Sequence, residues 1–180
     1  MNVWHDVNPA RISKDEFLVC VEISKGSKMK YELDKETGRL ILDRVLYTST
    51  HYPNNYGFIP RTLSGDGDAL DVLIMCTEPI VPLALVKAYP IGILKMIDSD
   101  EVDEKIIAIT ADDPSLNRYT DISELPPHML EEITHFFTVY KELEGKKTFV
   151  KEIAGSEEAK KIIAESMELY DQVYLKKEKK

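Results

Sequence analysis

The sequence predicts an α+β protein that is mainly β, in which an antiparallel barrel of short strands is covered by two helices. Short apolar runs with turn-forming residues between them fill the first two-thirds of the chain, which is typical of a barrel rather than of a βαβ sheet. In the last third, apolar residues recur at helical spacing. A length of 180 residues fits one domain, so a single domain is expected over residues 1–180.

Strands are expected where β-branched and aromatic residues cluster between turns. Residues 17–23 are rich in Val, Ile and Phe, and residues 30–34 alternate polar with apolar side chains, as in a half-buried strand. A turn at residues 25–27 separates these two runs. The later runs that predict strands are residues 39–45, 70–76, 84–89, 92–97 and 105–110.

Two amphipathic helices are expected in the last third. Pro127 is a favoured first-turn residue, apolar residues then recur as far as Leu143, and Gly145 is placed to end the helix. Ser156 can cap the second helix, which carries two glutamates in its first turn and ends in the basic residues 176–180. The apolar faces of both helices would pack on the barrel.

Composition restricts the classes of partner. The net charge of −9 disfavours nonspecific binding of nucleic acid through a broad basic face. No apolar run is long enough to span a bilayer, and residues 1–6 lack the pattern of a secretory signal, so we expect no membrane partner and a cytoplasmic location. Cys20 and Cys76 lack the spacing of zinc ligands and are expected in the core.

The strongest chemical signal is an acidic turn, residues 66–71, which reads Asp-Gly-Asp-Ala-Leu-Asp directly before an apolar run. Clustered carboxylates suit a hard divalent cation, and a bound cation relieves their mutual repulsion. Asp and Gly are also the commonest turn formers, so the hexapeptide alone fits a solvated turn equally well. A structural Ca2+ loop is another interpretation, although the twelfth position of an EF-hand would be Thr77 rather than Glu.

A long connection from Tyr47 to Gly67 is rich in aromatic residues. Its central part, residues 51–57, reads His-Tyr-Pro-Asn-Asn-Tyr-Gly. Phenol and amide groups beside the acidic turn could bind phosphate oxygens, and Tyr56 is the best candidate. The same side chains could instead close one end of the barrel.

An ordered series of motifs over residues 16–170 resembles the soluble family I inorganic pyrophosphatases. The motifs are Glu22 after a β run, Lys30-Tyr31-Glu32, Asp43-Arg44, residues 52–57, the acidic turn, residues 92–98 and residues 135–141. The resemblance implies an OB-like five-stranded β-barrel flanked by two main α-helices. It also implies metal-dependent hydrolysis of inorganic pyrophosphate (diphosphate) to two orthophosphates, by in-line attack of a metal-activated water.

The resemblance implies a role for each residue of the site. Asp68 matches the general base that takes the proton of the attacking water. The implied metal ligands are Glu22, Asp66, Asp71, Asp98 and Asp103. The implied phosphate-binding residues are Lys30, Arg44, Tyr56, Lys105, Tyr140 and Lys141.

The cofactors and the assembly are implied in the same way. Several Mg2+ ions are expected in each active site, with Mn2+ or Zn2+ as substitutes and Ca2+ as an inhibitor, and the chain is expected to form a homohexamer. Two positions depart from the family pattern. Ala69 stands where Pro or Glu is usual, and Ala111 follows a strand where relatives often have Pro. Because Ala69 supplies no ligand, we expect it to change the stiffness of the turn rather than the metal ligands.

Overall fold

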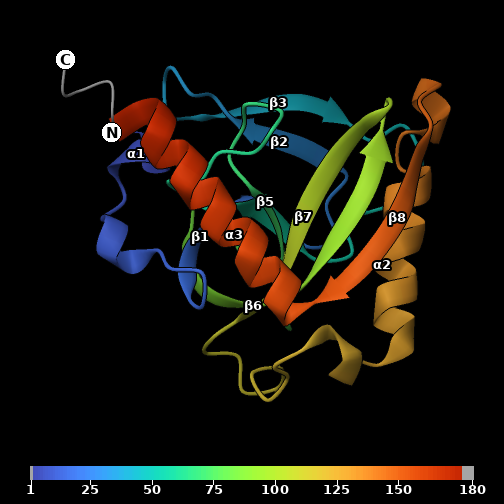
Figure 1. Cartoon of the computed structure of the whole chain (residues 1–180). Coiled ribbons are helices and arrows are strands. Elements are labelled where there is room, and N and C mark those ends of the chain that lie inside the picture. Colours follow the sequence, from blue (N-terminus) through green and yellow to red (C-terminus); the bar gives the residue numbers. More distant parts are fainter. Residues whose placement is uncertain (1, 176–180) are drawn as a thin grey trace.

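The computed structural model describes residues 2–175, and its strand pairings form a closed ring (Figure 1). In that ring β1 (Phe17–Ile23) pairs with β4 (Asn55–Phe58), and β4 pairs with β5 (Asp71–Met75). Next, β5 pairs with β7 (Glu101–Thr110), β7 with β6 (Leu85–Asp98), and β6 with β1. The ring confirms the five-stranded OB-like barrel that the family resemblance implies.

The other main elements lie around this barrel. β8 (Thr148–Gly155) extends the sheet beyond β6, and β2 (Met29–Leu33) forms a separate hairpin with β3 (Leu40–Val45). Figure 1 shows α3 crossing in front of the barrel and α2 beside β8, and these two helices cover the strands as expected. The helical segments are α1 (Val3–Asp6), η1 (Pro9–Arg11), η2 (Ile122–Glu124), α2 (Pro127–Val139), η3 (Glu142–Glu144), α3 (Ser156–Tyr170) and η4 (Asp171–Leu175). Over residues 2–175, no helix is both long and apolar enough to cross a bilayer.

The strands differ from the prediction in three ways. The runs 84–89 and 92–97 form one continuous strand, β6, because a register shift between Pro90 and Gly92 accommodates the proline. The pairing of β5 with β7 is parallel, so the barrel is not wholly antiparallel. The strands β4 and β8 were not predicted, since Asn and Gly in β4 weaken its pattern.

The apolar runs of β5 and β7 are continuous because both faces of these strands are buried. Alternate residues belong to two core clusters: Val72 packs with α3, whereas Leu73 packs with α2. Cys20 is buried in the core as expected. Cys76, just after β5, is only half-buried, so its predicted core position is wrong.

A close approach of two strands explains Gly57. A Cβ atom at this position would lie 2.0 Å from the carbonyl oxygen of Cys20 on β1. Any side chain would therefore push β4 away from β1 and open the ring of pairings next to Tyr56. The glycine is required by the barrel itself, not by a turn.

α2 ends earlier than predicted, and the start of α3 is capped by a different residue. α2 stops at Val139, and the chain continues as a turn and η3 before Gly145, whose φ of 73° is left-handed. Ser156 does not cap α3; instead the Asp121 carboxylate accepts a hydrogen bond of 2.8 Å from the backbone N–H of Ser156. A Cβ on Gly155 would lie 2.7 Å from that carboxylate, which explains the glycine. The predicted basic end of this helix, residues 176–180, lies outside the described residues.

We predict that Asp121→Ala lowers the free energy of unfolding by about 1 kcal/mol near neutral pH, because the first turn of α3 loses its cap. Hydrogen bonds from the backbone of Ser156 and Ser123 lower the pKa of Asp121 to about 2 in the folded protein. The stabilisation is therefore complete above the unfolded pKa and is lost as the pH falls toward the folded value. Urea unfolding measures the difference in free energy of unfolding between the unchanged protein and Asp121→Ala. This difference should be smaller at about pH 3 than at neutral pH. The exposed Asp112, as Asp112→Ala, is the control, and an equal loss in both variants would contradict the capping role.

Candidate active site

One cavity of about 280 Å³ brings together almost all of the predicted site residues. It opens where β1 and β6 end and where β5 and β7 begin, so strand ends supply most of its lining. Arg44 is the one predicted residue that does not line it. The predicted residues in its wall are Glu22, Lys30, Tyr56, Asp66, Asp68, Asp71, Asp98, Asp103, Lys105, Tyr140 and Lys141.

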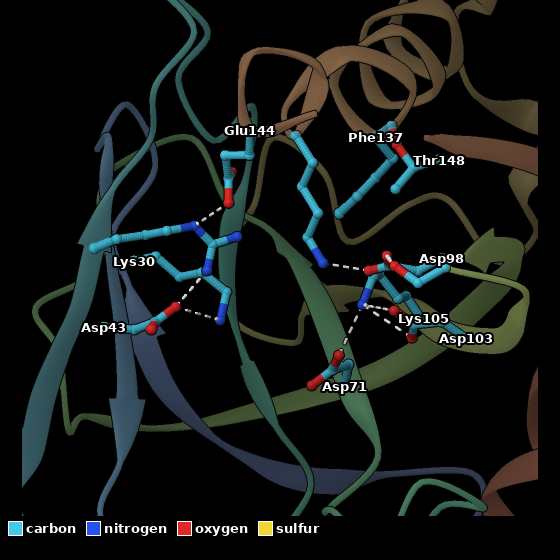
Figure 2. A network of polar contacts seen from close by, with 12 residues as sticks. Lys30, Asp43, Asp71, Asp98, Asp103, Lys105, Phe137, Glu144 and Thr148 are labelled. Atoms are coloured by element: carbon cyan, nitrogen blue, oxygen red, sulfur yellow. Dashed lines mark hydrogen bonds and ion pairs between the residues drawn. The ribbon is translucent and has the colours of Figure 1, made fainter. Parts of the chain in front are cut away.

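The centre of the site is the ammonium group of Lys105. The parallel register pairs Lys105 of β7 with Asp71 of β5, and Asp103 lies two residues earlier on the same face of β7. The ammonium nitrogen is 2.7 Å from Asp71 Oδ2, 3.0 Å from Asp103 Oδ2 and 2.9 Å from the hydroxyl of Tyr56. The same hydroxyl donates a hydrogen bond to Asp71. Figure 2 shows Lys105 between the two carboxylates.

Burial and charge act in opposite directions on Lys105. Its side chain is only 3% exposed, and this burial alone would lower its pKa, but Asp71 and Asp103 raise the pKa well above its ordinary value. The ammonium is therefore charged throughout the neutral range. It compensates carboxylates that would otherwise repel one another.

Burial disfavours the ionised form of two carboxylates of the site, Glu22 and Asp103. Burial raises the pKa of Glu22 to about 8, although the backbone N–H of Leu33 donates a 2.7 Å hydrogen bond to it. Burial also raises the pKa of Asp103; Lys105 opposes this effect, and Asp71 adds to it. Both groups would ionise more readily with additional positive charge beside them.

The donor set fits a hard metal ion. The anionic ligand oxygens of the cavity all come from carboxylates, and the lining contains neither His nor Cys, so this chemistry suits Mg2+ and similar ions. As placed in residues 2–175, no three Asp, Glu, His or Cys side chains are grouped to hold an ion, and ammonium groups lie against four of the predicted site carboxylates in the cavity. The pairs are Lys105 with Asp71 and Asp103, Lys141 with Asp98, and Lys35 with Asp68.

A second polar group lies beside the cavity and comes from the β2–β3 hairpin and η3. Lys30 and Arg44 both pair with Asp43, and Arg44 Nε is also 2.9 Å from a carboxylate oxygen of Glu144. Burial would lower the pKa of Arg44, but Glu144 and Asp43 raise it. Its Nη2 atom is buried without a hydrogen-bond partner among the described residues, so one donor group of the guanidinium is unused.

Neutral phenols and one lysine complete the wall. Burial raises the pKa of Tyr56, Tyr52 and Tyr140, so their hydroxyl groups remain hydrogen-bond donors. Lys141 pairs with Asp98; burial would raise the pKa of that carboxyl, but the ammonium lowers it overall. The cavity thus offers both donors and ionised acceptors.

The acidic turn is both a turn and part of the site. Gly67 has a left-handed φ of 87°, and the carboxylate of Asp66 accepts a 2.9 Å hydrogen bond from the backbone N–H of Asp68. Asp66 and Asp68 nevertheless line the cavity with Asp71. The two interpretations of the hexapeptide are therefore compatible.

Several residues of the site were not predicted. Tyr52 and Lys35 line the cavity, and Glu144 braces Arg44. Tyr52 lay in the aromatic connection that was already noted, but Lys35 lies in a polar turn that gives no functional signal. Trp4, the one tryptophan of the chain, also reaches the cavity from the N-terminal segment.

Comparisons with known proteins agree with this geometry. The family model of inorganic pyrophosphatase matches residues 19–171. Soluble inorganic pyrophosphatase 2 of Chlamydomonas reinhardtii is 49% identical over 172 residues, which cover 96% of this chain and 90% of the relative. Soluble inorganic pyrophosphatase 1 of Arabidopsis thaliana is 50% identical over 172 residues, which cover 96% and 81%.

Solved structures give the same result. The inorganic pyrophosphatase of Helicobacter pylori is 43% identical with a TM-score of 0.86, and the match covers 88% of this chain and 95% of that one. The enzyme from Thermus thermophilus is 34% identical with a TM-score of 0.87 and a coverage of 95% and 99%. With a site that joins carboxylates and cations in one cavity, these matches show that the chain belongs to the soluble family I inorganic pyrophosphatases.

Proposed function

We propose that the cavity carries out the reaction of this family, the metal-dependent hydrolysis of inorganic pyrophosphate to two orthophosphates. One observation supports the proposal most strongly: carboxylates and ammonium groups from distant parts of the chain line a single cavity. A protein of net charge −9 needs such locally placed cations, or metal ions, to bind an anionic substrate.

The carboxylates would hold the metal ions. Their oxygens suit Mg2+, with Mn2+ or Zn2+ as substitutes. When bound, such ions neutralise phosphate oxygens and acidify the water for in-line attack on phosphorus. The proposed ligands are Glu22, Asp66, Asp71, Asp98 and Asp103.

Asp68 is proposed as the general base. Its carboxylate lines the cavity and pairs with Lys35, whereas Asp71 and Asp103 are held by the central ammonium of Lys105. A carboxylate that is not used as a metal ligand is available to accept the proton of the attacking water. The role of Asp68 thus differs from that of its two neighbours in the acidic turn.

The substrate would be bound by cations and phenols. Lys30, Lys141 and Lys105 supply point charges, whereas the planar guanidinium of Arg44 can bind two phosphate oxygens. The partnerless Nη2 of Arg44 supports this assignment. The hydroxyl groups of Tyr56 and Tyr140 would donate hydrogen bonds to phosphate oxygens.

We further propose that the enzyme is a cytoplasmic homohexamer that binds neither nucleic acid nor membranes. The relatives from Chlamydomonas and Arabidopsis are named as soluble enzymes, and the acidic charge balance disfavours a nucleic-acid partner. Exposed apolar side chains such as Val81, at 71% exposure, would be covered by contacts between copies.

We expect Asp68→Asn to keep the fold and metal binding but to lower kcat by about a hundredfold or more, since the amide cannot accept the proton. Phosphate release from pyrophosphate with Mg2+ measures kcat, and calorimetry measures metal binding. Asp112→Asn, at an exposed site outside the cavity, is the matched control. Near-normal turnover of Asp68→Asn would remove this residue from the role of base.

Lys105→Met should lower the free energy of unfolding by about 2 kcal/mol without metal, because Asp71 and Asp103 lose their buried partner. Saturating Mg2+ should recover part of this loss, since the ion neutralises the same carboxylates. Urea unfolding with and without Mg2+ tests both effects. Lys87→Met, which breaks an exposed pair with Glu16, is the control. If Lys105→Met lost the same free energy of unfolding with and without Mg2+, this result would argue against metal binding by Asp71 and Asp103.

Ca2+ should compete with Mg2+ and inhibit hydrolysis, because its larger radius and looser coordination geometry would misplace the attacking water. Titrating Ca2+ at several fixed Mg2+ concentrations should show inhibition that Mg2+ relieves. Full activity with Ca2+ alone would contradict the proposed role of the ions.

A further inference from the structure

The N-terminal segment is fastened to the loop 59–70, which contains most of the acidic turn. The indole N–H of Trp4 donates a 2.8 Å hydrogen bond to the carbonyl oxygen of Thr62. Arg61, with a left-handed φ of 59°, donates its backbone N–H to the Trp4 carbonyl at 2.9 Å and its guanidinium to the His5 carbonyl at 2.7 Å. These contacts hold a backbone conformation that a non-glycine residue seldom adopts.

The side chain of Thr62 forms hydrogen bonds to both ends of the loop. Its hydroxyl donates a 2.6 Å hydrogen bond to the carbonyl of Ile59 and accepts one of 2.9 Å from the N–H of Leu70. Within the loop, the N–H of Ser64 donates to the carbonyl of Asp68 at 2.7 Å. The backbone of Asp68 is therefore linked to Trp4 by two hydrogen bonds, Trp4 to Thr62 and Ser64 to Asp68, and by the chain that joins Thr62 to Ser64.

The face of the same indole restrains the Asp68 side chain. The ammonium of Lys35 lies 5.0 Å from the centre of the Trp4 ring and pairs with the Asp68 carboxylate. The side chain of Asn2 donates a 2.9 Å hydrogen bond to the Lys35 carbonyl. The side chains of Lys35 and Asp68 are 47% and 60% exposed, so the pair adds little to the free energy of unfolding.

Trp4 itself is firmly held. It is 3% exposed, and its ring stacks on His5 at 4.6 Å and meets Tyr174 edge-on at 5.6 Å. Trp4, Lys35 and Asp68 also line the same cavity. Trp4 is thus a rigid side chain that contacts both Thr62 and Lys35, and through them it can fix the position of the Asp68 carboxylate.

We propose that Trp4 is a positioning residue for hydrolysis, which holds the backbone of Asp68 through Thr62 and its carboxylate through Lys35. The proposal rests on the proposed function, in which Asp68 accepts the proton of the attacking water. Small displacements of a catalytic group slow the chemical step far more than they weaken substrate binding. Trp4 should therefore affect kcat and not KM.

The first test is Trp4→Phe, which keeps an aromatic ring in the cluster but loses the hydrogen bond to Thr62. With saturating Mg2+ we expect kcat for pyrophosphate to fall about tenfold, while KM changes less than about twofold. The matched control is Tyr174→Ala, which removes an aromatic neighbour of Trp4 but neither contact to Thr62 or Lys35. An unchanged kcat in Trp4→Phe, or an equal fall in Tyr174→Ala, would overturn the proposal.

The second test changes the exposed Lys35, so it does not depend on whether the Trp4 variant folds. Lys35→Met should lower kcat with little effect on KM, and Lys35→Arg, which can stack on the indole and pair with Asp68, should restore most of the activity. A raised KM with an unchanged kcat would overturn the positioning role, because it would place Lys35 among the substrate-binding residues.

The third test combines Trp4→Phe with Asp68→Asn. If Trp4 acts through Asp68, the double variant should have the kcat of Asp68→Asn alone, whereas a full additional fall would overturn the proposal. The proposed base is tested separately by Asp68→Asn: near-normal turnover of that single variant defeats the base assignment and the positioning role with it. A large loss in Asp68→Asn combined with normal turnover in Trp4→Phe defeats the positioning role alone.

Discussion

A buried ammonium between two carboxylates is the constraint on which the rest of the site depends. Lys105 is charged at 3% exposure, and leaving it without Asp71 and Asp103 would cost several kcal/mol of stability. These partners meet only if β5 and β7 keep their parallel register, because a shift by one residue would turn a side chain to the other face. The ionic core of the site and the closure of the barrel therefore require the same alignment.

The charged groups of the site come from different parts of the fold. Lys105 and most of the carboxylates belong to barrel strands, and Asp66 and Asp68 belong to the acidic turn. Lys30 and Arg44 come from the hairpin, and Lys141 follows α2. Bringing them together costs chain entropy, which is compensated by the two apolar clusters that attach α2 and α3 to the barrel. A substitution that loosens either apolar cluster should therefore disturb the arrangement of the site, even where no site residue is changed.

Much of the fold could be predicted from local pattern, but elements set by tertiary contacts could not. β1 and β5 are recognisable as short apolar runs, and α2 has clear helical periodicity. In contrast, β4 is a strand because its neighbours bury it, and β6 runs through Pro90 because a bulge absorbs the proline. For the site, the family resemblance named many of the residues that line the cavity, and it also named Arg44, which lies beside the cavity. It did not include Trp4 or Lys35, since their link to Asp68 is a contact between distant segments that no local spacing encodes.

The closed ring of strands also bears on how the protein behaves at high concentration. Each of the five ring strands has partners on both sides, so within residues 2–175 the main sheet offers its free edge at β8. Unpaired edges are where chains join into aggregates, and charged side chains on them discourage such pairing. The exposed Lys151 and Glu152 stand on this strand, beside the exposed apolar Phe149. The free edge of the main sheet thus carries charge on residues that do not line the cavity.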